Sequence, residues 1–166
     1  MAIEEPADEN ESVMAAIIYA EAGVATGEAP TTEMYAVGWT LRNRYLHVQT
    51  TYGRPDRRWF GTGATLESIA THGDEFVSAD GPRYRKFRTA LATITHPGEI
   101  TFGNLCVRAA REILAAPEPT TPGVTGTYPF VWFQKGASRP SGRASRDSTM
   151  HGVHHFWSFA PGRERG

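Results

Sequence analysis

The most regular hydrophobic pattern in the chain lies near its N-terminal end. Apolar residues recur there at the spacing of one helix face, and the last member of that face is a carboxylate: Met14, Ile17, Ile18 and Glu21. We therefore expect a helix over residues 13–21, ended by Ala22-Gly23. The polar residue at the end of this apolar face is the first candidate for a functional role.

Four later segments carry the same helical period. Thr31 or Thr32 can cap the first of them, Thr65 can cap the second, and Pro82 suits the first position of the third. The predicted helices are residues 32–45, a short helix after Thr65, residues 82–95 and residues 102–115.

Two segments near the C-terminal end, residues 128–133 and 152–159, are rich in aromatic and β-branched residues, as strands are. A Gly/Ser/Arg loop over residues 136–148 separates them, so they can pair as a hairpin. The sequence thus predicts a mostly helical α+β fold with a small C-terminal β-hairpin or sheet. Residues 1–12 are expected to form a flexible acidic segment, and residues 13–166 a single domain.

Charge and cysteine content narrow the class of protein. Lys and Arg number 17 against 18 Asp and Glu, a formal net charge of -1, so overall charge favours neither nucleic acid nor an acidic membrane as a partner. Arginines predominate from Arg139 to Arg165, where they can form a local basic surface for an anionic polymer. Cys106 is the single cysteine, and its apolar helical setting favours a buried thiol over a nucleophile.

The first eleven residues lack the basic and apolar regions of a signal peptide. The chain also has no run of about 18 apolar residues, the length that spans a membrane. We expect a protein made in the cytoplasm, without membrane insertion and without a nucleic acid partner.

Glu21 has two interpretations. A carboxylate that ends an apolar face either reaches solvent and forms an ordinary ion pair, or it is partly desolvated. Desolvation favours the protonated form of a carboxylate, which is the form that a general acid uses.

A second catalytic carboxylate has no fixed place in the sequence. Glu28 and Glu33 are candidates to assist Glu21. Most glycosidases use two carboxylates, but a substrate with a 2-acetamido group can supply its own carbonyl in place of the second one. One glutamate can then protonate the leaving oxygen and later act as a base.

The histidines at 151, 154 and 155 form a cluster of the kind that binds metals, but they lack the helical spacing of a zinc protease. On a strand, His154 and His155 point to opposite faces, so we expect no metal there. Gly61-Thr62-Gly63 fits neither a P-loop nor a dinucleotide motif, and we expect no cofactor. His154 is instead expected to be a structural or substrate-side hydrogen-bonding residue.

Aromatic residues of the predicted strands are candidates for a wall on which sugar rings stack: Trp132, Phe133 and Trp157. Core packing is the alternative use of such residues.

Five motifs stand in one order along residues 13–159. They are Ile18-Tyr19-Ala20-Glu21-Ala22 followed by Gly27-Glu28, a small-residue helix ending in Asn43-Arg44, Glu75-Phe76 with Asp80-Gly81, an aromatic strand at 128–133 after Pro119, and Gly152-Val153-His154-His155-Phe156. In this order they resemble the cell wall hydrolase family typified by spore cortex-lytic (SleB-type) enzymes.

The resemblance implies a lysozyme-like fold and cleavage of peptidoglycan glycan strands between MurNAc and GlcNAc. The enzyme would be a lytic transglycosylase or a muramidase, with Glu21 as its catalytic residue. Glu28 and Glu33 are candidates to assist, and the candidates for contacts with the substrate are Asn43, Phe76, Trp132 and His154.

Peptidoglycan lies outside the cell membrane, so such an enzyme needs a non-classical route to the cell wall. A phage endolysin released during lysis and an antibacterial effector delivered into the periplasm both fit. The effector would have a secretion apparatus and an immunity protein as partners. Two other functions stay open, namely a zinc-dependent peptidoglycan amidase or peptidase that uses the C-terminal histidines, and a non-catalytic wall-binding module.

Overall fold

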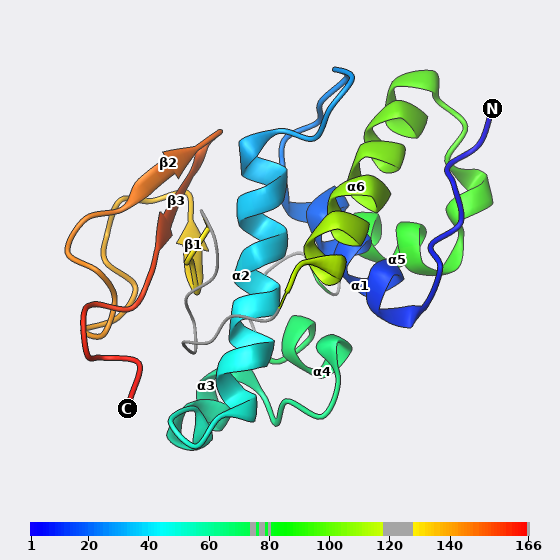
Figure 1. Cartoon of the computed structure of the whole chain (residues 1–166). Coiled ribbons are helices and arrows are strands. Elements are labelled where there is room, and N and C mark those ends of the chain that lie inside the picture. Colours follow the sequence, from blue (N-terminus) through cyan, green and yellow to red (C-terminus); the bar gives the residue numbers. More distant parts are fainter. Residues whose placement is uncertain (74–75, 77–78, 80, 118–127, 166) are drawn as a thin grey trace.

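The structure, a computed structural model, describes residues 1–73, 76, 79, 81–117 and 128–165. Within this part the fold is α+β and mostly helical, which confirms the predicted fold class (Figure 1). The helices are α1 (Glu9–Glu21), α2 (Thr32–Gln49), α3 (Arg57–Phe60), α4 (Leu66–Ala70), α5 (Pro82–Thr89) and α6 (Pro97–Ala115), with 3₁₀ turns η1 (Arg54–Asp56) and η2 (Leu91–Thr93). The strands are β1 (Trp132–Gln134), β2 (Thr149–His151) and β3 (His154–Trp157).

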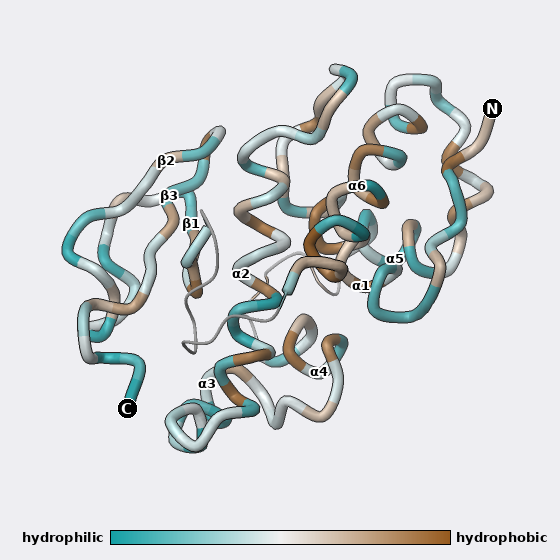
Figure 2. The backbone as a smooth tube through the Cα atoms, viewed as in Figure 1, coloured by the Kyte–Doolittle hydropathy of each residue, from teal (hydrophilic) through white to brown (hydrophobic). Residues whose placement is uncertain are grey.

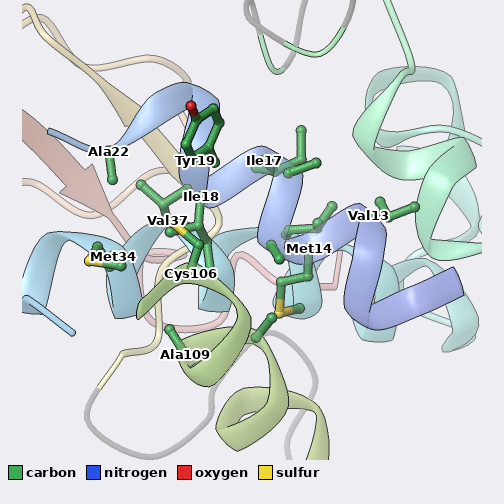
Figure 3. Packing of buried hydrophobic residues seen from close by; sticks show 14 of the residues in the cluster. Val13, Met14, Ile17, Ile18, Tyr19, Ala22, Met34, Val37, Cys106 and Ala109 are labelled. Atoms are coloured by element: carbon green, nitrogen blue, oxygen red, sulfur yellow. The ribbon is translucent and has the colours of Figure 1, made fainter. Parts of the chain in front are cut away.

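Helix α1 lies at the centre of the helical part, where it packs against α2, α4, α5 and α6. As a result all residues from 13 to 19 are buried, and not only the face that the sequence pattern marks (Figure 3). A helix that is apolar on every side is typical of a core position. Cys106 of α6 belongs to the same cluster and is fully buried, which confirms the expected buried thiol. Figure 2 shows the hydrophobic segments gathered where α1 and α6 meet.

Helix α2 stands between the sheet and the other helices (Figure 1). Thr31 caps it, as predicted, by accepting a hydrogen bond from the Met34 amide at 3.3 Å. Because both sides of α2 are covered, it buries charged side chains as well as apolar ones, including Glu33 and Arg44. These polar side chains of α2 determine how the sheet is attached to the helices.

The sheet has the strand order β1-β3-β2, and both pairings are antiparallel. The pairing of β1 with β3 confirms the predicted contact between the two C-terminal segments. The sequence did not predict β2, which pairs with β3 across a tight turn at Gly152 and Val153. The strand expected over residues 128–133 begins only at Trp132, because the carbonyls of Tyr128 and Phe130 accept hydrogen bonds from the Asn43 side chain of α2.

Several residues of the N-terminal segment 1–12, which the sequence analysis expected to be flexible, contact the rest of the domain in the structure. Ile3 is only 6% exposed, and the Glu4 amide donates to Asn104 Oδ1 at 2.7 Å. Helix α1 begins at Glu9, four residues before the predicted start, because Asp8 caps it through the Glu11 amide at 2.9 Å. The acidic residues of this segment are paired with arginines of α5 and α6: Glu9 with Arg88, and Glu4 and Glu11 with Arg111.

Other helix boundaries also differ from those that the sequence predicts. The helix predicted to reach residue 95 ends at Thr89, and a 3₁₀ turn follows. Helix α6 begins at Pro97 rather than near residue 102, with the His96 side chain accepting from the Gly98 amide. Helix α3, which buries Phe60, is not among the helices that the sequence pattern predicts. None of the described helices combines the length and apolar character needed to cross a membrane.

Candidate active site

Glu21 occupies the point where the central helix leaves the core. It is the last residue of α1, and it is half-buried, whereas the seven residues from 13 to 19 are buried. The Ala22 amide donates to the Ile18 carbonyl at 2.9 Å, after which the chain is extended. The predicted helix end is therefore confirmed. Glu21 thus lies between the buried core and the surface.

Glu33 lies two residues into α2 and connects three segments of the chain. Its side chain is only 6% exposed. Oε1 accepts a hydrogen bond from the Gly23 amide, two residues after Glu21, and Oε2 accepts one from the Val153 amide in the β2–β3 turn at 2.8 Å. A negative charge is favourable in the first turn of a helix. Glu33 thus ties the segment that follows Glu21 to the sheet.

His154, the first residue of β3, lies next to the Glu33 carboxylate. Its Nδ1 lies 3.5 Å from Glu33 Oε2, and its side chain is buried. As predicted from the strand period, His154 and His155 point to opposite faces, because His155 is half-buried and its Nδ1 contacts the Ser148 hydroxyl at 2.8 Å. Burial lowers the pKa of the neighbouring His151, while the Glu33 carboxylate acts in the opposite direction.

Asn43 is fully buried in α2. Its Nδ2 donates to the carbonyls of Tyr128 at 2.9 Å and Phe130 at 2.8 Å. The structure thus places this residue, a predicted substrate contact, away from the surface. Asn43 holds the segment that leads into β1, and any effect on the site acts through that strand.

Phe76, the second predicted contact residue, is only 2% exposed. Its ring lies 5.6 Å from the ring of Phe133, and the Arg44 guanidinium lies 4.8 Å from its centre. The structure thus places Phe76 in the core, where it supports Phe133, rather than at the surface. The motif residues around it at 74, 75, 77, 78 and 80, and Pro119, lie outside the described residues.

Trp132 lines a cavity of about 600 Å³ between β1, α3 and the loop before β2. Volumes of this order are typical of sites for small molecules. Aromatic side chains, two arginines and an aspartate surround it together with small polar groups: Arg44, Asp56, Trp59, Phe60, Trp132, Phe133, Gln134, Pro140, Ser141 and Arg143. Glu21 and Glu33 are not among these residues.

Phe133 connects the two parts of the candidate site. It lines the cavity, and its ring also lies 5.2 Å from that of His154. The Glu33–His154 pair and the aromatic cavity therefore share a neighbour.

Trp157 does not contribute to the cavity, which corrects its assignment as a stacking candidate. It is 1% exposed, and its ring stacks on His155 at 5.9 Å. Glu28 is exposed in the α1–α2 loop, and the structure gives its side chain no part in the cavity.

The sequence analysis did not identify the buried polar residues at the cavity, Asp56 with its partners His47 and Arg143. Asp56 is 3% exposed, and its two carboxylate oxygens contact His47 Nε2 and Arg143 Nη1. Burial lowers the pKa of His47, although the Asp56 hydrogen bond acts against that effect. Asp56 and Arg143 are 87 residues apart in sequence, so no local pattern marks this pair.

Comparisons of the chain with known protein families, with curated proteins and with solved structures found no match. Among the described residues no group of three His, Cys, Asp or Glu side chains could hold a metal ion. The function is therefore argued from the residues and geometry above.

Proposed function

We propose that the protein cleaves the glycan strands of peptidoglycan between MurNAc and GlcNAc, with Glu21 as its general acid. The observation that carries this proposal is the position of Glu21, half-buried at the exit of the most deeply buried helix. The next segment is bound through Gly23 to the buried Glu33, so the end of this helix is connected to the sheet as well as to the core.

In this proposal Glu21 donates its proton to the glycosidic oxygen, and the C–O bond at the anomeric carbon breaks. The 2-acetamido carbonyl of the substrate assists at that carbon. Glu21, now a carboxylate, takes a proton from the attacking hydroxyl. If that hydroxyl belongs to the sugar itself, the product is an anhydro-sugar and the enzyme is a lytic transglycosylase. If it belongs to water, the enzyme is a muramidase.

Glu33 and His154 are assigned positioning functions, because both are buried and Glu33 already accepts two backbone hydrogen bonds. The half-buried Trp132 in the wall of the cavity also supports the proposal, since sugar rings stack on indole faces. The zinc-dependent alternative gains no support from the donor groups in the described residues.

Digestion of purified sacculi by the native protein and by Glu21→Gln tests the proposal. We expect the variant to release soluble muropeptides more slowly by about 10²- to 10⁴-fold, the usual contribution of a general acid. The matched control is Glu5→Gln, which makes the same change at an exposed carboxylate remote from the site. Mass spectrometry of the products separates anhydro-ends from reducing ends.

Full activity in Glu21→Gln would contradict the assignment of the acid. Loss of activity on adding a chelator would favour the zinc enzyme. Binding to sacculi by the native protein, without release of soluble products, would instead indicate the non-catalytic wall-binding module.

A further inference from the structure

We propose that one end of the molecule, formed by residues 52–59 and 163–165, binds the surface of an anionic phospholipid membrane. This inference goes beyond the proposed function and does not rest on it. Exposed arginines and aromatic residues are concentrated at this end, which we call the basic end: Tyr52, Arg54, Arg57, Arg58, Trp59, Arg163 and Arg165.

Tertiary contacts bring the two segments of the basic end together. The Arg165 guanidinium lies 5.0 Å from the centre of the Tyr52 ring. Arg143 joins the same segments, because its Nη1 pairs with Asp56 and its Nε donates to the Arg163 carbonyl at 2.8 Å. The last described residues therefore lie beside η1 and α3, as Figure 1 also shows.

The net charge of -1 conceals an uneven distribution of charge along the chain. Residues 51–60 and 135–165 together contain nine lysines and arginines against three carboxylates, whereas the rest of the chain has eight against fifteen. The part of the chain that includes the basic end thus has an excess of six positive charges. Clusters of about four to eight basic residues are typical of proteins that bind anionic lipids.

Carboxylates neutralise arginines of the helical part, but not those of the basic end. On α5 and α6, four arginines form ion pairs with glutamates: Arg83, Arg88, Arg108 and Arg111. Within the residues that the structure describes, none of the five arginines of the basic end forms an ion pair with a carboxylate. Arg57 donates instead to the Val48 carbonyl at 3.3 Å.

The carboxylates nearest in sequence to these arginines do not cancel their charge. Asp56 is 3% exposed, and its oxygens already contact His47 and Arg143. Glu164 is half-buried and stands between two exposed arginines in the sequence. The basic end therefore presents a positive potential to the solvent, and such a potential attracts anionic surfaces.

The aromatic residues of the basic end favour a membrane over a nucleic acid strand. Trp59 is 61% exposed and Tyr52 is 37% exposed. An arginine lies over each ring, Arg58 at 5.6 Å from the centre of Trp59 and Arg165 over Tyr52. Tryptophan and tyrosine are enriched at the level of lipid headgroups, where guanidinium groups bind phosphate. None of the five arginines lines the cavity beside β1, whereas a nucleic acid strand is bound in a charged groove.

Binding at the basic end leaves the candidate active site free. Residues 52–59 follow the C-terminal end of α2, whereas Glu33, in the first turn of α2, binds the segment after Glu21. Helix α2 has 18 residues, so it is about 27 Å long and separates the two ends of the molecule. A protein bound to the membrane in this way keeps Glu21 away from the lipid.

Flotation with lipid vesicles tests the inference, with vesicles of phosphatidylcholine alone and vesicles that contain equal parts of phosphatidylcholine and phosphatidylglycerol. We expect the protein to bind only the anionic vesicles, and to bind them more weakly as the salt concentration rises. Trp59 supplies a fluorescence signal, because it is the exposed tryptophan, whereas Trp39 and Trp157 are buried and Trp132 is half-buried. Its emission should shift to the blue on binding, and Trp59→Phe should lose most of this shift.

Arg58→Glu changes the charge of the basic end by two units at an exposed side chain. We expect it to bind the anionic vesicles about 30-fold more weakly, because each basic residue near such a surface contributes about five-fold in affinity. Lys86→Glu is the matched control, since it makes the same change in net charge at an exposed residue of α5, and it should bind nearly as tightly as the native protein. If Arg58→Glu does not fold, Arg165→Glu makes the same test in the other segment of the basic end.

Equal binding to the two kinds of vesicle would overturn the inference, as would an equal loss of binding in Arg58→Glu and Lys86→Glu. Release of the protein from the anionic vesicles by an equal charge concentration of single-stranded DNA would also overturn it, since it would indicate a surface for polyanions in general. Digestion of sacculi plays no part in these measurements, so the membrane surface and the proposed function can fail separately.

Discussion

The carboxylates of Glu21 and Glu33, two of the candidates that the sequence offers, differ in burial and in hydrogen bonding. Glu21 is half-buried and ends the helix, whereas Glu33 is buried and accepts two backbone hydrogen bonds from different segments. A buried carboxylate that accepts hydrogen bonds from two amides is expensive to move. Glu33 is therefore better suited to hold Glu21's segment in place than to react.

Gly152 is the residue on which this arrangement depends most closely. Its φ is +60°, and a Cβ atom there would lie 1.6 Å from Glu33 Oε2. We expect Gly152→Ala to lower the free energy of unfolding by about 3 kcal/mol, through backbone strain and displacement of Glu33. Gly162→Ala is the control, because Gly162 has a φ of +74° but nothing within 4 Å, so that only strain of about 1 kcal/mol applies. Urea unfolding measures both, and equal losses would contradict the contact with Glu33.

Helix α2 is the element that joins the two halves of the molecule. Its first turn carries Glu33, which binds the β2–β3 turn, and its later turns carry Asn43 and Arg44, which bind the backbone just before β1. Arg44 Nε donates to the Val131 carbonyl at 2.6 Å. Hydrogen bonds from α2 therefore attach the small sheet, and the cavity lies where α3 approaches β1.

Two histidines, His47 of α2 and His151 of β2, should make stability depend on pH. Burial lowers the pKa of both His47 and His151. In the unfolded chain these histidines take up protons near pH 6.5, a pH at which both stay neutral in the folded protein. Their contribution to the free energy of unfolding is complete above about pH 6.5 and is lost as the pH falls through the lowered values. Urea midpoints between about pH 7.5 and 5 should fall less steeply in His47→Gln, and least in the double variant with His151→Gln. Identical slopes in all three proteins would refute this account.

A hydrophobic cluster extends over most of the part of the molecule that the structure describes, with members from Ile3 to Phe159. Single domains of up to about 150 residues usually unfold in one step, and we expect the same of this chain of 166 residues. The attachment of the sheet through α2 adds polar contacts to the same cluster instead of a second core.

Cys106 reports on this cooperativity, because it is the single cysteine and is fully buried. Burial also raises the pKa of its thiol well above the usual value, which slows its reaction further. We expect a thiol reagent to label it only as fast as the whole chain unfolds. Labelling across a urea series should follow the loss of helical circular dichroism at the same midpoint. Labelling at a clearly lower urea concentration would show that α6 opens on its own.

Local sequence patterns predicted correctly those features that depend on interactions between residues close together in the chain. The apolar period placed α1 and its end at Glu21, Thr31 and Thr65 capped the helices predicted for them, and strand alternation placed His154 and His155 on opposite faces. Caps and periodicities depend on hydrogen bonds and side-chain directions within a few residues, so they are legible in the sequence. Boundaries failed where a distant partner intervened, as at residues 128–131, which Asn43 holds out of the strand.

The sequence by itself determined the mostly helical α+β class, the buried Cys106 and the place of Glu21 at the end of an apolar helix. Only the tertiary structure decided what surrounds that carboxylate. It buried Glu33 against Gly23 and Val153, withdrew Asn43 and Phe76 from the surface, and brought Asp56 and Arg143 together with Trp59 and Trp132 around one cavity. These contacts join residues up to 120 positions apart. Their energies depend on distance in space and on exclusion of water, and the spacing of residues along the chain predicts neither of these.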